Sequence, residues 1–189
     1  MPVLTRTSLA ATLAVAGLLV TACTGSDGAT PEAGGEGPYA GLAGRDISSL
    51  SDDDVDGLLG GEGLGYAMPA ELNDYPGPAH VLQLADELGI DDDQATQIER
   101  IQANMRAAAR DLGPQLVDAE WQLDEAFRDG TAVDRLDELT RQSAQIEARL
   151  RSVHLQAHLE TTELLEADQI ETYNRLRGYD SSSAKGDPR

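Results

Sequence analysis

Two long runs of the chain repeat their apolar residues at spacings of three and four, and this pattern constrains the fold more than any other feature. Such spacing places the apolar side chains on one stripe of an α-helix, which must be buried against another element. The first run covers about residues 92–128 and the second begins near Val133. The stripe positions are Ile98, Ile101, Met105, Ala108, Leu112, Leu116, Ala119, Leu123 and Phe127, then Leu136, Leu139, Ser143, Ile146, Leu150, Val153 and Ala157. The turn segment "RDGTAV" between the runs predicts an antiparallel helical hairpin.

Gly113 and Pro114 interrupt the first run without ending its stripe. Because proline lacks the helical N–H donor, we expect a kink or short break here and not a reversal. Shorter helical segments flank the hairpin: "HVLQLADEL" ends at Gly89 and "ADQIETYNRLRGY" ends at Gly178, and glycine commonly follows a helix. The predicted fold is all-α, a four-helix domain over residues 66–179 built on a long, kinked antiparallel hairpin.

The N-terminus resembles an export signal. Its first 22 residues contain one arginine and an apolar run, Leu9 to Val20, that is too short to span a bilayer as a mature helix. The run stops at "VTAC", directly before Cys23, the chain's only cysteine, in the pattern of bacterial lipoproteins. We therefore expect a signal peptide over residues 1–22 and lipidation at Cys23, which would attach the protein to a membrane of the cell envelope through its acyl chains alone. The alternative is a secreted protein with one buried thiol.

Residues 23–65 are rich in glycine and poor in aromatic residues, which predicts a flexible, disordered tether. Ser51 before the acidic turn "SDDD" favours one short helix within it. The spacing of aspartates there also resembles a calcium loop, but Gly63 stands where a bidentate glutamate is needed, so an acidic helix start is the favoured interpretation. Residues 180–189 are predicted to be a disordered tail.

The formal net charge of −20 limits the partners of the protein. Such a charge repels nucleic acid and anionic headgroups, and it favours cations, metal ions and basic or partly apolar polypeptide. The chain has no G-x-S-x-G motif and no phosphate-binding glycine loop. We therefore expect no enzyme activity and no required cofactor.

The stretch "RSVHLQAHLE" places His154 and His158 one helical turn apart, so both imidazoles could reach one ion. His80, after a Pro-Gly-Pro turn, could complete a site for zinc, copper or nickel. Additional donors would be Glu71, Glu120, Glu160 and Met105. The pair also fits a structural helix face or a proton-sensing role. Leu155 stands where the H-E-x-x-H motif needs its glutamate, which excludes hydrolysis by that route.

Two aromatic residues, Trp121 and Phe127, are predicted to pack in the core or along the hairpin. Met105 lies on the apolar stripe and is expected first as a filler between helices.

A short pattern occurs twice, each time at a helix start. Its copies are Ile90-Asp91-Asp92-Asp93-Gln94 and Leu165-Glu166-Ala167-Asp168-Gln169. With the hairpin between them, they resemble the twice-occurring Leu-Thr-x-x-Gln of the Spy/CpxP group of envelope chaperones and its heavy-metal-sensing relatives. Asp91 and Glu166 replace the threonine. In the first copy, Asp91 and Gln94 also fit a capping box.

The resemblance implies a non-enzymatic, four-helix, often dimeric envelope domain that binds unfolded polypeptide, tunes a sensor protein or senses metal. The metal-sensing relatives use a histidine pair four apart, matched here by His154 and His158. The chaperones present a basic concave surface, whereas this chain is acidic. The leading hypothesis is a lipid-anchored binding protein that holds partly folded polypeptide or modulates an envelope stress response. The alternatives are a metal sensor using His80, His154 and His158, and a purely structural lipoprotein that forms a homodimer.

Overall fold

A computed structural model describes residues 37–179 of the chain. The expected signal peptide, the lipidation site Cys23, the first part of the tether and the predicted tail at residues 180–189 lie outside the described residues.

Within residues 37–179 the fold is all-α and contains no strand, as predicted. None of the helices in this part of the chain combines the length and the hydropathy required to cross a bilayer. The elements are a 3₁₀ helix Ala40–Leu42 and the α-helices α1 Asp52–Gly60, α2 Met68–Glu71, α3 Pro78–Gln83, α4 Ala85–Leu88, α5 Asp92–Asp129, α6 Val133–Thr162 and α7 Ala167–Arg177.

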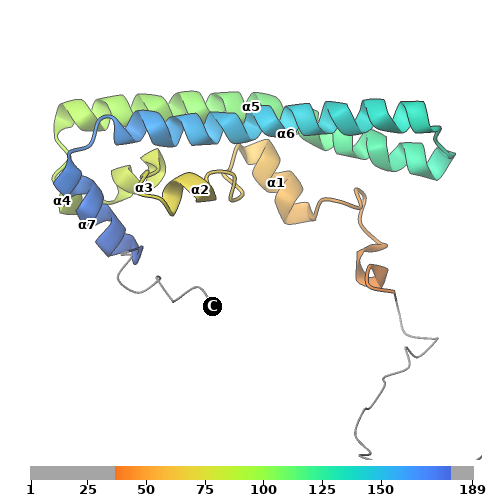
Figure 1. The fold of residues 1–189 in the computed structure, drawn as a ribbon, viewed down its shortest axis with the longest axis horizontal. Coiled ribbons are helices and arrows are strands. Elements are labelled where there is room, and N and C mark those ends of the chain that lie inside the picture. The colour runs from red at the N-terminus through yellow and green to blue at the C-terminus, as the bar shows by residue number, and fades with distance from the viewer. Residues whose placement is uncertain (1–36, 180–189) are drawn as a thin grey trace, which may run out of the picture. The chain divides into compact units, whose positions relative to one another are not determined.

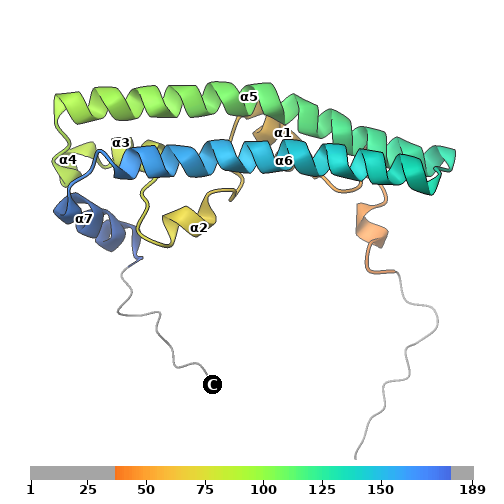
Figure 2. The ribbon, with the colours of Figure 1, turned by 45° about the horizontal axis from the view of Figure 1, so that its top comes forward.

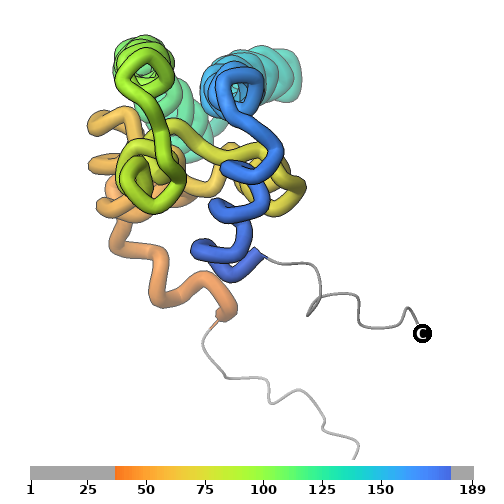
Figure 3. The backbone as a smooth tube through the Cα atoms, turned by 90° about the vertical axis from the view of Figure 1, so that its left-hand side faces the viewer, coloured from red at the N-terminus to blue at the C-terminus, as the bar shows by residue number. Residues whose placement is uncertain are grey.

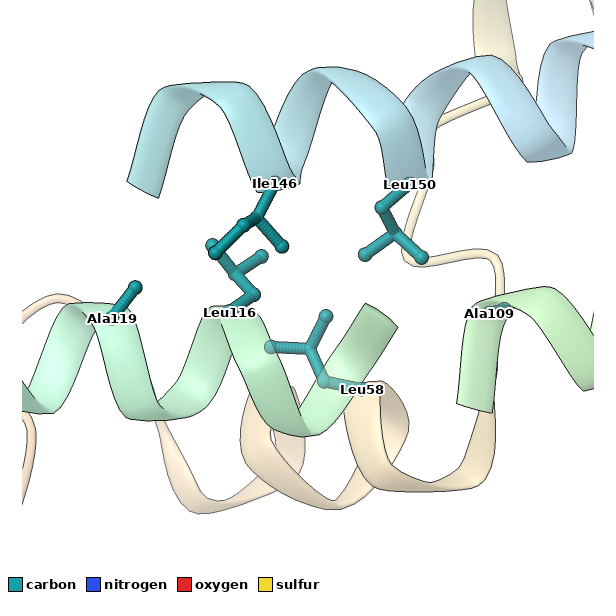
Figure 4. Packing of buried hydrophobic residues seen from close by; sticks show 6 residues of the cluster. All are labelled: Leu58, Ala109, Leu116, Ala119, Ile146 and Leu150. Atoms are coloured by element: carbon teal, nitrogen blue, oxygen red, sulfur yellow. The ribbon is translucent and has the colours of Figure 1, made fainter. Parts of the chain in front are cut away.

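Helices α5 and α6 form the predicted antiparallel hairpin (Figures 1 and 2). Gly130 closes α5 in a left-handed conformation with φ 80°, which a side chain would disfavour. The stripes of the two helices meet in one core cluster with Leu58 of α1 (Figure 4). The buried members of this cluster are Leu58, Ala109, Leu116, Ala119, Ile146 and Leu150.

The remaining helices lie on one side of the hairpin, as the end view shows (Figure 3). We call α1–α4 and α7 the short-helix layer. A second core cluster joins this layer to the start of α5 and contains Val81, Leu88, Ile98 and Tyr173. The segment expected as one helix from His80 to Leu88 is divided at Leu84 into α3 and α4.

Helix α5 continues through Gly113 and Pro114, so the prediction that the chain does not reverse there is confirmed. Figure 2 shows that α5 bends where α1 lies against it. A Cβ atom at Gly113 would lie 2.0 Å from the carbonyl oxygen of Leu58. The glycine therefore permits close contact between α5 and the backbone of α1.

The domain begins earlier than residue 66, because part of the predicted tether packs against the hairpin. Ile47 and Leu58 are buried, and Ser51 caps α1 together with Asp54 in a capping box. Few apolar residues are enough to dock this segment, because Gly113 lets α5 approach the backbone of α1 closely, and Gly57 leaves room for the side chain of Leu64. The short helix predicted at Ser51 is confirmed.

The expectation that Trp121 and Phe127 are core residues is wrong. Their exposed fractions are 46% and 62%. Both lie in the last part of α5, toward the hairpin turn. Trp121 borders an open groove that α1 and the segment before it also line, so neither side chain is enclosed. An apolar stripe is buried only along the length over which another element packs on it.

Candidate functional site

The two copies of the repeated pattern begin helices α5 and α7. Asp91 accepts a hydrogen bond from the Gln94 backbone N–H at 2.8 Å, and Gln94 Oε1 accepts from the Asp91 N–H at 3.1 Å, which forms the predicted capping box. In the second copy, the Glu166 N–H donates to Gln169 Oε1 at 2.9 Å. Both glutamines thus satisfy a backbone donor that the helix itself leaves free.

The same two glutamine side chains contact each other. Gln94 Nε2 donates to Gln169 Oε1 at 3.0 Å, and Gln169 Nε2 donates to Gln94 Oε1 at 3.2 Å. Gln94 Nε2 also donates to the carbonyl oxygen of Leu164 at 2.7 Å. The amide pair therefore joins the start of α5 to the start of α7, a structural role that positions α7 against the hairpin.

A second polar cluster is centred on Glu71 at the end of α2. The phenol of Tyr173 in α7 donates a hydrogen bond to Glu71 Oε1. Glu71 Oε1 also lies 3.4 Å from His80 Nδ1 of α3 and 3.7 Å from Arg177 Nε of α7, and Glu71 Oε2 lies 3.7 Å from His158 Nδ1 of α6. One carboxylate thus connects four helices, three of them in the short-helix layer.

Burial strengthens the electrostatics of this cluster. The Glu71 side chain is only 12% exposed, and among the described residues its Oε2 is a buried oxygen with no hydrogen-bond partner. Burial raises the pKa of Tyr173, and so do the hydrogen bond to Glu71 and its negative charge. Tyr173 therefore stays protonated and remains a donor to the carboxylate.

His158 is fixed by the turn between α2 and α3. Its Nδ1 lies 2.8 Å from the carbonyl oxygen of Tyr75. Because a carbonyl only accepts, Nδ1 carries the proton, and the lone pair of the neutral ring lies on Nε2. A Cβ atom at Gly77 would lie 2.7 Å from His158 Cε1, so this close contact requires glycine.

His154 faces a different neighbour. Its ring stacks on Tyr66 with the ring centroids 5.9 Å apart. Burial lowers the pKa of His154, and the nearby His158 lowers it further. The structure therefore brings His80 and His158 to Glu71, whereas His154 packs as a neutral ring against Tyr66.

Within residues 37–179 no three His, Cys, Asp or Glu side chains are arranged to hold a metal ion. Glu120 accepts from Ser49 at 2.7 Å and from Ser143. Met105 and Glu160 line a different groove, between α5 and α6. Metal binding at the three histidines stays a prediction, because the structure places His80 and His158 at Glu71 but packs His154 against Tyr66.

An apolar cleft of about 460 Å³ adjoins the Glu71 cluster. Its most exposed apolar wall comes from α2 and the C-cap residue that follows it, where Met68 is 58% exposed and Leu72 56%. The lining residues are Gly63, Leu64, Gly65, Ala67, Met68, Glu71, Leu72, His80, His158 and Tyr179. Exposed apolar residues grouped in a cleft are typical of a binding surface.

Sequence reasoning identified Glu71, His80 and His158 but not Tyr173, Arg177 or the cleft. The segment "LGYAMPAELNDYPGP" has no helical period, so its apolar residues are not assigned to a face. Leucine and methionine are uncommon in turn-rich segments, so their presence here was the available signal for an apolar surface.

One comparison with known proteins gives a match. Residues 79–177 match the family model that is described as "LTXXQ motif family protein". The match contains both copies of the repeated pattern and the whole hairpin, whereas α1, α2 and Glu71 precede it. No curated protein and no solved structure matches the chain.

Proposed function

The chain belongs to the LTXXQ motif family, the family of the Spy/CpxP type, and from this premise we propose that it is a lipid-anchored cell-envelope protein that holds partly folded polypeptide. Proteins of this family belong to the cell envelope and are not known as enzymes. The proposal places the anchor at Cys23 and the binding surface on the short-helix layer.

The apolar cleft is the observation that supports binding. Met68 and Leu72 expose more than half of their surface beside Leu64. Partly folded chains expose apolar side chains, which such a cleft would cover by removing apolar surface from water. The polar Glu71 cluster next to it holds the cleft wall in place, because it ties α2 to α3, α6 and α7.

The test is suppression of aggregation of an unfolded model protein in the presence of a chelator. We expect suppression at near-stoichiometric amounts by the full chain, and a loss of most of it in the double variant Met68→Ser, Leu72→Ser. The control double variant Phe127→Ser, Val133→Ser changes two similarly exposed residues at the hairpin turn. Equal activity of the two double variants would place binding elsewhere, and no suppression by the wild type would refute the proposal.

Metal sensing is the competing proposal. Its support is the position of Glu71 between His80 and His158. It predicts that Zn²⁺, Cu²⁺ or Ni²⁺ binds and that the double variant His80→Ala, His158→Ala no longer binds the ion. Titration calorimetry, with Glu120→Gln as a control, separates the two proposals, because suppression of aggregation with chelator present needs no metal.

A further inference from the structure

The charges of the chain are unevenly distributed between the two layers. Residues 46–93, which include α1–α4, contain thirteen acidic residues and no lysine or arginine. Residues 94–162, which include most of the hairpin, contain eight arginines and twelve acidic residues. The acidic character of the protein is therefore concentrated in the layer that carries the cleft.

The charges at the floor and at the rim of the cleft differ. At the floor, Glu71 lies 3.7 Å from Arg177, which offsets its charge. In the sequence, the exposed residues Glu62 and Asp74 flank the segment that forms the wall, and no lysine or arginine lies between them. Glu62 directly precedes the lining residue Gly63, and Asp74, which accepts a hydrogen bond from Asn174 at 2.6 Å, follows the lining residue Leu72 by two positions. On the opposite side, Arg177 lies 5.6 Å from the ring of the lining residue Tyr179. A ligand seated on Met68 and Leu72 would therefore meet apolar surface bordered by negative charge.

This combination of surfaces restricts the occupant. A second copy of the chain would bring its own acidic layer against this one, and like charges across an interface disfavour association. Nucleic acid and anionic lipid are disfavoured for the same reason. A segment with one apolar face and lysine or arginine beside it matches both the cleft and its rim, and an amphipathic helix presents this arrangement at positions i, i+3, i+4 and i+7.

We propose that the cleft selects cationic amphipathic segments of polypeptide. This inference rests on the proposed function and names its substrate class. The apolar face of the segment packs on Leu64, Met68 and Leu72, and its basic side chains lie toward Glu62 and Asp74. The wall precedes residues 79–177, so the selectivity comes from the part of the chain outside the family match.

The experiment compares two labelled helical peptides with the same leucine face, one with lysine and one with glutamate on its polar face. Fluorescence anisotropy with the full chain measures their affinities at low and high salt. We expect the lysine peptide to bind at least about tenfold more tightly at low salt, and this preference to decrease at high salt, because screening weakens exposed charge pairs.

Variants test the two parts of the surface separately. Glu62→Gln with Asp74→Asn should weaken lysine-peptide binding by about three- to tenfold and reduce the preference. Asparagine suits residue 74 because its φ is +69°. The control Asp134→Asn, Asp137→Asn at the start of α6 should leave both affinities unchanged. Met68→Ser with Leu72→Ser should weaken both peptides.

The outcomes separate the inference from the proposed function. Equal affinities, or tighter binding of the glutamate peptide, would overturn the cationic selectivity and leave a cleft that holds polypeptide by its apolar surface alone. Failure of the chain to bind either peptide and to suppress aggregation would overturn both.

Discussion

The hairpin and the short-helix layer of this protein are stabilised in different ways. Helices α5 and α6 are 38 and 30 residues long and present continuous apolar stripes. The same kind of apolar side-chain contact therefore recurs at successive turns of the pair. The helices of the short-helix layer have between 4 and 11 residues, and they are held by individual contacts such as Glu71 with Tyr173 and Gly113 with Leu58. Helices this short are not stable alone.

This difference in stabilisation corresponds to a difference in role, because one region supports the fold and the other carries the candidate binding surface. The hairpin supplies the long surface on which the short helices pack, whereas the layer supplies the exposed apolar wall of the cleft and the acidic residues that flank it. Changes at the single contacts that join the layer to the hairpin should therefore lower stability more than changes at neighbouring residues outside these contacts, and the following predictions test this.

The largest effect is expected for Gly113→Ala. Its new Cβ would lie 2.0 Å from the Leu58 carbonyl oxygen and 2.6 Å from its carbon, and these backbone atoms cannot move without displacing α1. We expect the free energy of unfolding to fall by about 3 kcal/mol, the upper range for overpacking, in urea titrations followed by circular dichroism. Gly60→Ala is the matched control, because its Cβ would meet only the flexible Glu62 side chain at 3.6 Å. Equal stability of the two variants would contradict the close contact.

A smaller effect is expected for the glutamine pair. Gln94→Ala and Gln169→Ala should each cost about 1–2 kcal/mol, because each removes one partner of a part-buried amide pair. If the pair acts as one unit, the double variant should cost about 1 kcal/mol less than the sum of the single variants. Gln97→Ala serves as the control, since this exposed side chain bonds only within its own helix. Strictly additive losses would show that the two amides act independently.

The smallest effect concerns pH. Burial holds the pKa of His154 below its ordinary value of 6.5, so the unfolded chain takes up a proton more readily than the folded one. The stability associated with neutral His154 is therefore present above pH 6.5 and is lost as the pH falls below it, at no more than about 1.4 kcal/mol per pH unit.

His154→Phe keeps an aromatic ring against Tyr66 and removes the titration. Thermal unfolding between pH 5 and 8 should show a flatter profile for this variant than for the wild type. Identical profiles would mean that His154 does not contribute to the acid sensitivity.

Prediction from the sequence succeeded where the signal was local or periodic. The apolar stripes located both long helices, the turn at Gly130 and the continuation of α5 past Pro114. The pairing of Asp91 with Gln94 located the start of α5. Prediction failed for Phe127, which continues the stripe toward the hairpin turn but is 62% exposed. It also failed for Leu58, which lies in the predicted tether but is buried in the core cluster, where Gly113 lets α1 and α5 approach closely.

The amino-acid sequence by itself determined the helical class, the hairpin and the family pattern, because helical periodicity and capping depend on residues within a few turns of each other. Only the tertiary structure decided that His80 and His158 lie beside Glu71, that His154 does not, and that α2 opens an apolar cleft. The physical reason is that these contacts join residues up to about a hundred positions apart, such as Glu71 and Tyr173. Their distances depend on how the short helices pack on the hairpin, and no spacing in the chain encodes that packing.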